Sequence, residues 1–135
     1  MNVLGLPPES SFAPLKPERV IYEDDYAVAF YDRYPVSPGH ALVVAKRVSI
    51  SVFDLPIEIQ CHLWKAVDEA RDILRQRHGP DGYNIGINDG PAAGQTINHA
   101  HIHIIPRYKG DQPDPRGGVR WIFPEQARYW EDPQT

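Results

Sequence analysis

The stretch Gly94–Pro106, with the sequence GQTINHAHIHIIP, decides the fold of this chain. Three of its residues are histidines that alternate with small or aliphatic residues. Successive side chains of a β-strand point to opposite faces. We therefore expect His99, His101 and His103 to share one face of a strand, while the alanine and isoleucines between them pack on the other face.

Three imidazoles on one face allow three interpretations. They could be structural histidines with satisfied hydrogen bonds, or ligands of Zn, Cu, Fe or Ni, which imidazole suits. They could also form a site where one histidine acts as nucleophile or acid/base among groups that bind an anion. Gly94 lets the backbone approach a ligand, and the amides and side chains of Gln95 and Thr96 can donate to oxyanions. This combination favours a phosphate site over a metal site.

The rest of the chain predicts strands around one long helix. Residues 19–22 and 26–31 are β-branched and aromatic and flank a polar turn, so they predict a hairpin. Residues 41–45 form an apolar run typical of a buried strand, and residues 83–88 predict another strand. Apolar residues recur every three or four positions from Ile57 to Arg77, which predicts an amphipathic helix that Gly79 and Pro80 end. This order indicates an antiparallel α+β sheet.

Bulk properties exclude several classes of protein. The chain has 135 residues, enough for one domain with a single core. Its formal net charge of −4 argues against a general nucleic-acid surface. No apolar run is long enough to cross a bilayer, so we expect no membrane partner. The single Cys61 excludes an internal disulfide, and the first residues lack the features of a signal peptide, so we expect a cytoplasmic protein.

The histidine stretch resembles the histidine-triad (HIT) family, whose His-x-His-x-His motif is followed by two hydrophobic residues. Asn88–Thr96 leads into the motif with the family's spacing, and Tyr34–Val44 resembles its upstream partner segment. The resemblance continues through Pro80–Asn88 and Gly117–Trp121. It covers nearly the whole chain beyond the first ten or so residues.

The resemblance implies a fold and a domain organisation. It implies an α+β, HIT-like fold with an antiparallel sheet of about five strands, one long helix and short helices. It also implies a homodimer in which the two sheets form one continuous sheet. We expect residues 1–18 to be an extended arm and residues 19–110 the HIT domain. Residues 111–135 would be a tail packed on the domain or on its dimer partner.

The resemblance also implies an activity. It is that of a nucleotide hydrolase or transferase cleaving at the α-phosphate of a purine nucleoside phosphoramidate or dinucleoside polyphosphate. A neutral imidazole is a good nucleophile near pH 7, and by resemblance the nucleophile is His101, which would form a covalent nucleotidyl-histidine. His40, His99 and His103, with Gln95 and Thr96, would supply hydrogen-bond donors around the phosphate.

The same comparison assigns residues to the nucleoside. Phe30 resembles the position that packs against the base, and Asp32 resembles the carboxylate that accepts from ribose hydroxyls. Asn88 and Gly94 fall at positions that contact the nucleotide. Each residue also has a structural explanation on its own: Phe30 in the core, Asp32 in a turn and Asn88 at a strand end.

No structural metal or cofactor is expected. Many relatives carry a Cys-x-x-Cys pair near the N-terminus as part of a zinc site. Ser10 and Ala13 occupy the apparent places here, and Val48 stands where those relatives often have another histidine. These residues do not provide zinc ligands. We expect that catalysis requires no cofactor, although Mg²⁺ could accompany a polyphosphate substrate.

Two alternatives remain open from the sequence. A nucleotide-binding or sensing module would keep the pocket without turnover, and the intact His101 disfavours it. A metal-dependent enzyme would use two or three of the histidines as ligands. The absence of a nearby carboxylate on the histidine strand weakens that alternative.

Overall fold

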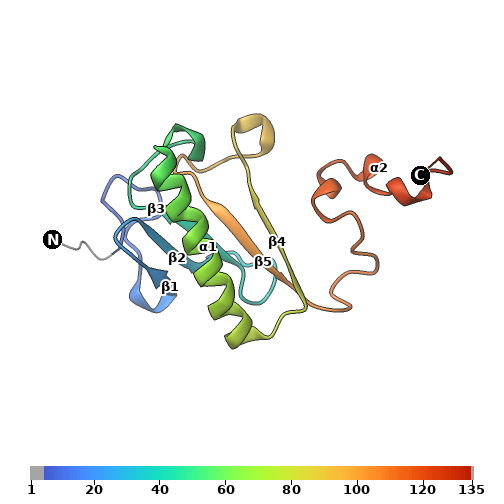
Figure 1. Cartoon of the computed structure of the whole chain (residues 1–135), viewed down its shortest axis with the longest axis horizontal. Coiled ribbons are helices and arrows are strands. Elements are labelled where there is room, and N and C mark those ends of the chain that lie inside the picture. Colours follow the sequence, from blue (N-terminus) through green and yellow to red (C-terminus); the bar gives the residue numbers. More distant parts are fainter. Residues whose placement is uncertain (1–4, 135) are drawn as a thin grey trace.

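The computed structural model describes residues 5–134 and contains a five-stranded sheet in which every neighbouring pair is antiparallel (Figure 1). The strand order across the sheet is β1-β2-β3-β5-β4. The strands are β1 (Val20–Glu23), β2 (Ala27–Tyr31), β3 (Ala41–Ala45), β4 (Gly82–Ile87) and β5 (Ile102–Arg107). The predicted antiparallel α+β architecture is confirmed.

One long helix, α1 (Ile57–His78), covers one face of the sheet (Figure 1). Its apolar residues follow the helical period, and the fully or nearly fully buried ones are Leu63, Ala66, Val67, Ala70 and Leu74. The helix ends where Gly79 adopts the left-handed conformation and donates its N–H to the carbonyl of Arg75 at 3.0 Å. No helix among residues 5–134 has the length and apolar character that crossing a membrane requires.

The N-terminal arm covers the opposite face of the sheet. Val28, Phe30, Leu42 and Val44 are buried there, and the arm packs Leu6, Phe12 and Leu15 against them. A 3₁₀ turn at Pro17–Arg19 then leads into β1. The described part of the arm is irregular, with turns closed by hydrogen bonds from Ser10 to the carbonyl of Pro7 and from Ala13 to the carbonyl of Ser10, and it completes the second layer of the core. Residues 1–4 of the predicted arm lie outside the described residues.

Cross-strand register places a row of side chains on the arm face. Phe30 is opposite Leu42, Leu42 is opposite His103, and His103 is opposite Gly86. Paired residues share a face, so His103 stands between a leucine and a glycine. Because Gly86 has no side chain, space remains open beside the imidazole.

The strand that carries the histidine motif is shorter in the structure than the sequence predicts. Regular pairing begins at Ile102, so His99 and His101 precede β5 in the segment that leads into it. The alternation nevertheless extends through this segment, because Ala100 joins the core under α1 while both rings contact Phe12 of the arm. The N–H of Ala100 donates to the carbonyl of Ser49 rather than to a neighbouring strand, which explains why regular strand pairing begins only at Ile102.

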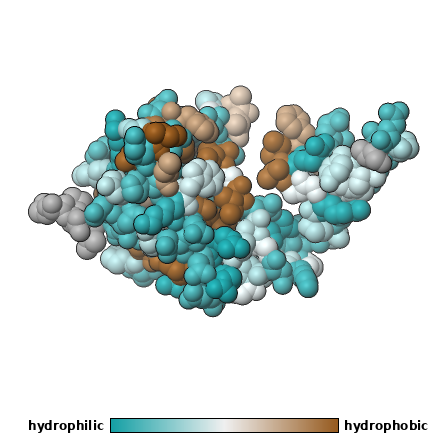
Figure 2. Space-filling model, in the orientation of Figure 1, coloured by the Kyte–Doolittle hydropathy of each residue, from teal (hydrophilic) through white to brown (hydrophobic). Residues whose placement is uncertain are grey.

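The C-terminal tail extends beyond β4 and folds largely on itself (Figure 1, red). It contains the short helix α2 (Pro124–Ala127) between two 3₁₀ turns. The indole of Trp121 donates to the carbonyl of Arg116 at 2.8 Å, and the guanidinium of Arg128 lies over the same indole. Ile122 and Phe123 are 80% and 68% exposed. Figure 2 shows apolar surface on both sides of the gap between the tail and the domain.

Gly39, which immediately precedes His40, permits a test of loop packing. Its φ is +88°, and a Cβ there would lie 2.9 Å from Cδ2 of His78 at the end of α1. Nε2 of His78 is 3.0 Å from the hydroxyl of Tyr31, so moving the ring away from an added methyl group would break this hydrogen bond. We expect Gly39→Ala to lose about 1–2 kcal/mol for the left-handed backbone and roughly 1 kcal/mol more for the contact.

Gly110 provides a matched control, because its φ is +82° and a Cβ there would meet nothing within 4 Å. Urea unfolding should show that Gly110→Ala loses only the backbone contribution. Adding His78→Ala should remove the excess loss of Gly39→Ala. Equal losses for the two alanine variants would show that the contact with His78 has no energetic effect.

Candidate active site

A cleft of about 780 Å³ opens on the arm face of the sheet. Its walls come from the arm, from the loop between β2 and β3, and from the loop before β5. His40, His101 and His103 line it together, with Asp32, Asn88 and residues 94–96. The structure thus brings most of the predicted site residues to one cavity. His99 and Phe30 do not line it.

A backbone carbonyl fixes the tautomer of His101. Nδ1 of His101 lies 2.9 Å from the carbonyl oxygen of His99. A carbonyl can only accept, so the hydrogen of the ring is on Nδ1. A neutral ring then has its lone pair on Nε2, and His101 lines the cleft. The sequence could not identify this acceptor, because it is a main-chain group.

A backbone N–H fixes His40 and, through it, His103. Val36 donates its N–H to Nδ1 of His40 at 3.1 Å, so the ring hydrogen of His40 is on Nε2. That nitrogen is 2.9 Å from Nδ1 of His103 and 3.4 Å from a carboxylate oxygen of Asp32. His103 therefore accepts at Nδ1 and carries its own hydrogen on Nε2. This histidine can donate a hydrogen bond to a phosphate oxygen.

Burial keeps these rings neutral. It lowers the pKa of His103 to about 4, and the nearby His101 and His40 act in the same direction. Burial also lowers the pKa of His40, while the charge of Asp32 opposes the shift. The neutral forms agree with the hydrogen-bond directions: His40 accepts at Nδ1 and donates from Nε2, and His103 accepts at Nδ1.

The same geometry bears on the metal alternative. Asp32, His40 and His103 each offer a ligand atom, and these atoms lie within 4.8 Å of one another. A metal-bound neutral imidazole carries its hydrogen on the nitrogen that does not bind the metal. Nδ1 of His40 faces the N–H of Val36 and cannot carry a hydrogen there. This cluster therefore fits a hydrogen-bond relay and does not fit a metal site.

The placement of His99 corrects one expectation. The ring is 1% exposed, its Nε2 is 2.8 Å from the carbonyl of Ala45, and its Nδ1 is 2.6 Å from the hydroxyl of Ser10. Both nitrogens are used inside the protein, so the ring cannot donate to a phosphate in the cleft. Its carbonyl, rather than its imidazole, contributes to the cleft, because this carbonyl accepts the hydrogen bond from Nδ1 of His101.

The glycine-rich loop corrects a second expectation. The side chain of Gln95 accepts from the N–H of Gly90 and donates to the carbonyls of Ile50 and Ile97. Its backbone N–H also donates to Gly90. Gln95 thus holds the loop in shape, and it is not free to donate to an oxyanion. Thr96 is exposed and lines the cleft.

Phe12 occupies the place where the sequence suggested Phe30. Phe30 has no exposed surface, and the ring of Phe12 packs edge-on against it with centroids 5.4 Å apart. Phe12 lines the cleft and lies 5.3 Å from the ring of His101. A base entering this cleft would meet Phe12 rather than Phe30.

Three cationic side chains also line the cleft and were missed by the sequence reasoning: Lys16, Arg19 and Arg33. The guanidinium of Arg19 donates to the carbonyl of Tyr31. Lys16 and Arg33 lie in irregular segments with frequent prolines, where no period indicates which side chains point inward. Arg33 directly follows Asp32, so its place beside the predicted carboxylate was the one available signal. An acidic chain thus presents positive charge next to the histidines.

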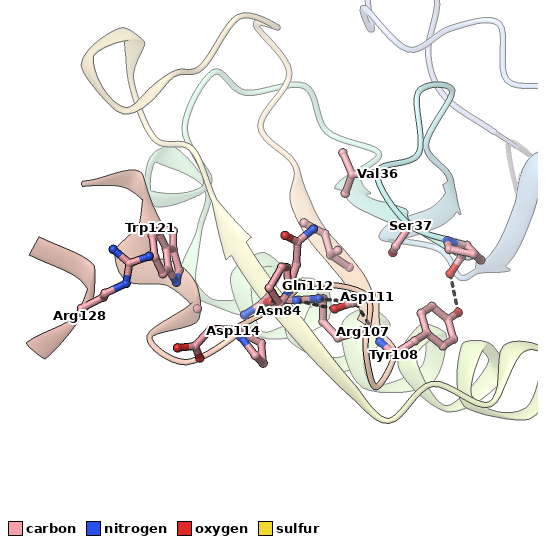
Figure 3. Close-up of a pocket in the computed structure, with 15 residues that line it drawn as sticks. Val36, Ser37, Asn84, Arg107, Tyr108, Asp111, Gln112, Asp114, Trp121 and Arg128 are labelled. Carbon is pink, nitrogen blue, oxygen red and sulfur yellow. Dashed lines mark hydrogen bonds and ion pairs between the residues drawn. The ribbon is translucent and has the colours of Figure 1, made fainter. Parts of the chain in front are cut away.

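A second cleft, of about 650 Å³, lies between the sheet and the tail (Figure 3). Arg107 there donates to Asn84 and to both carboxylate oxygens of Asp111, and the hydroxyl of Tyr108 donates to the carbonyl of Pro38. Its lining contains neither an imidazole nor a thiol. The first cleft is therefore the candidate active site.

Comparison with known proteins identifies the family of this chain. The model of the HIT domain matches residues 14–110, and the chain belongs to the HIT family. An uncharacterized HIT-like protein of Methanocaldococcus jannaschii is 44% identical over 95 residues, which cover 70% of this chain and 73% of that protein.

Two further relatives have names that state an activity. A bis(5'-adenosyl)-triphosphatase of Dictyostelium discoideum is 36% identical over 97 residues, which cover 72% of this chain. The match spans only 65% of that relative, slightly less than two thirds of its length. The crystal structure of Plasmodium falciparum diadenosine triphosphate hydrolase in complex with cyclomarin A matches with a TM-score of 0.68 and 31% identity, over 72% of this chain and 66% of that one.

The lowered pKa of His103 predicts how stability depends on pH. An unfolded histidine titrates near 6.5, whereas His103 in the fold titrates at about 4. Between these values the unfolded chain binds more protons, so the free energy of unfolding falls as the pH is lowered through this window. Urea unfolding at pH 7 and pH 4.5 should show that His103→Asn weakens this dependence. An unchanged slope in His103→Asn would contradict the assignment.

Proposed function

We propose that this chain is a nucleotide hydrolase or transferase that cleaves dinucleoside polyphosphates at an α-phosphate, with His101 as the nucleophile. The observation that carries the proposal is the hydrogen bond from Nδ1 of His101 to the carbonyl of His99, which leaves a lone pair on Nε2 beside an open cleft. The names of two relatives support a dinucleoside polyphosphate over the nucleoside phosphoramidate that the family resemblance also allows.

In the first step, Nε2 of His101 attacks the α-phosphorus and the bond to the leaving phosphate oxygen breaks. The ring keeps its hydrogen on Nδ1, so the nucleotidyl-imidazole carries a positive charge that the carbonyl of His99 stabilises. In the second step, water attacks the phosphorus, the P–N bond breaks and returns its electron pair to Nε2, and the water gives up a proton to the solvent. The products are a nucleoside monophosphate and the regenerated neutral imidazole, so one displacement is divided into two.

Stabilisation of charge on the phosphate comes from neutral and cationic donors. His103 offers the N–H at Nε2, held by the chain from Val36 through His40. Lys16 and Arg33 would interact with the polyphosphate beyond the α-position. Phosphoryl transfer depends mainly on positioning and charge stabilisation. We propose that the transfer needs no metal bound by protein ligands, although Mg²⁺ can enter with the polyphosphate.

The nucleoside would bind in the part of the cleft that Phe12 and Asp32 line. We propose that Phe12 contacts the base and that Asp32 accepts hydrogen bonds from ribose. Asp32 is prepared for this role, because the N–H of Tyr34 donates to one of its carboxylate oxygens at 2.8 Å and the other is near His40. Asn88 and Gly94 lie along the same cleft.

A trapped intermediate would test the nucleophile. Rapid quenching of the enzyme with diadenosine triphosphate should give an adduct of one adenylyl group on His101, detected by intact and peptide mass spectrometry. His101→Ala should abolish the adduct and reduce kcat by at least about 10³-fold, as is typical when a nucleophile is removed. His62→Ala, a surface histidine stacked on Tyr26, serves as control. Full turnover by His101→Ala would refute covalent catalysis, and tight binding without turnover would favour the sensing module.

We further propose that two copies form the homodimer that the family resemblance implies. The strand β4 is at the edge of the sheet, and the tail beyond it exposes Ile122 and Phe123. A second copy would cover these side chains. Light scattering should give the mass of two chains, and Phe123→Glu should shift the mass toward one chain. Phe53→Glu, at an equally exposed phenylalanine outside the tail, is the control, and a single-chain mass for the wild type would contradict the proposal.

A further inference from the structure

Ser10 in the N-terminal arm contacts the histidine motif 89 positions away. Its hydroxyl oxygen is 2.6 Å from Nδ1 of His99, and the two residues are 4% and 1% exposed. A buried polar contact of this length between distant segments is strong and specific. The set of site residues inferred from the sequence does not include this serine.

The direction of each hydrogen bond in this contact is determined by the backbone. Nε2 of His99 donates to the carbonyl of Ala45 at 2.8 Å, so Nδ1 of the neutral ring carries the lone pair. The hydroxyl of Ser10 therefore donates to Nδ1, and its oxygen accepts the N–H of Phe12 at 3.1 Å. His99 is therefore held between the arm and the end of β3 in one tautomer and one orientation.

Because hydrogen bonds hold the ring of His99 at both nitrogens, they also hold the backbone of this residue in place. The carbonyl of His99 is the acceptor that holds the hydrogen of His101 on Nδ1. Phe12 adds packing, because its ring contacts both His99 and His101. We propose that Ser10 is a positioning residue: through His99 it holds the carbonyl that keeps His101 in its nucleophilic tautomer. The consequence for catalysis rests on the function proposed above, whereas the effect on the tautomer does not.

Removing the hydroxyl should disturb this arrangement without removing any group that touches a substrate. In Ser10→Ala, Nδ1 of His99 loses its donor in a buried place, where a polar group without a partner is unfavourable. The ring can recover a partner only by turning or by moving its hydrogen, and either change shifts the residue and its carbonyl. His101 would then populate the tautomer with the hydrogen on Nε2, which has no lone pair for attack.

The chain offers a matched control in Ser51. Its hydroxyl oxygen accepts from the N–H of Phe53 at 3.1 Å, the same contact two residues ahead that Ser10 makes with Phe12, and no histidine is involved. Ser51→Ala therefore removes an equivalent local turn contact away from the cleft. Ser10→Thr keeps a hydroxyl and tests whether the donor restores the wild-type behaviour.

The first experiment is ¹⁵N NMR of the imidazoles in the full chain without nucleotide. We expect His101 to carry its hydrogen on Nδ1 in the wild type, in Ser51→Ala and in Ser10→Thr. In Ser10→Ala we expect a mixture of the two tautomers at His101. A single Nδ1–H tautomer in Ser10→Ala would overturn the proposal.

The second experiment is steady-state hydrolysis of diadenosine triphosphate. We expect Ser10→Ala to lower kcat on the order of tenfold, the effect of one lost hydrogen bond, with KM unchanged because no substrate contact is removed. A kcat equal to that of Ser51→Ala would overturn the catalytic part. If the wild type itself lacks turnover, the proposed function fails, while the NMR experiment still decides the role of Ser10.

Discussion

Backbone groups that can only donate or only accept fix the tautomers of His40, His99 and His101. The N–H of Val36 sets His40, and the carbonyls of Ala45 and His99 set the rings of His99 and His101. A neutral histidine has two tautomers, and one main-chain partner is enough to select between them. The chemistry of the cleft therefore depends on where the sheet and its flanking loops place these three groups.

The arm makes this placement stable. It covers the face of the sheet that α1 leaves open, and Phe12 stands between the core residue Phe30 and the ring of His101. The same segment provides Ser10 to His99 and Lys16 to the cleft. Burial of the apolar face and construction of the polar site therefore depend on the same segment of the chain.

The sequence predicted features that depend on local pattern. Alternation placed the three histidine rings on the arm side of the sheet, and the helical period located α1 to within one residue at each end. Contacts between distant segments left no such pattern. Phe30 seemed available to a base because nothing in the sequence shows that Phe12 covers it. Gln95 seemed free because its partners Gly90 and Ile50 are brought to it by the fold.

In the proposed reaction, the lowered pKa of His103 would matter for catalysis as well as for stability. A permanently protonated imidazole at this place would attract the phosphate already in the ground state, and interactions of equal strength in both states do not accelerate the chemical step. A neutral N–H gains most where negative charge increases on the oxygens of the transition state. Burial beside His101 and His40 keeps His103 in this form. In the proposed reaction, Lys16 and Arg33, which line the same cleft, would contribute to binding of the polyphosphate.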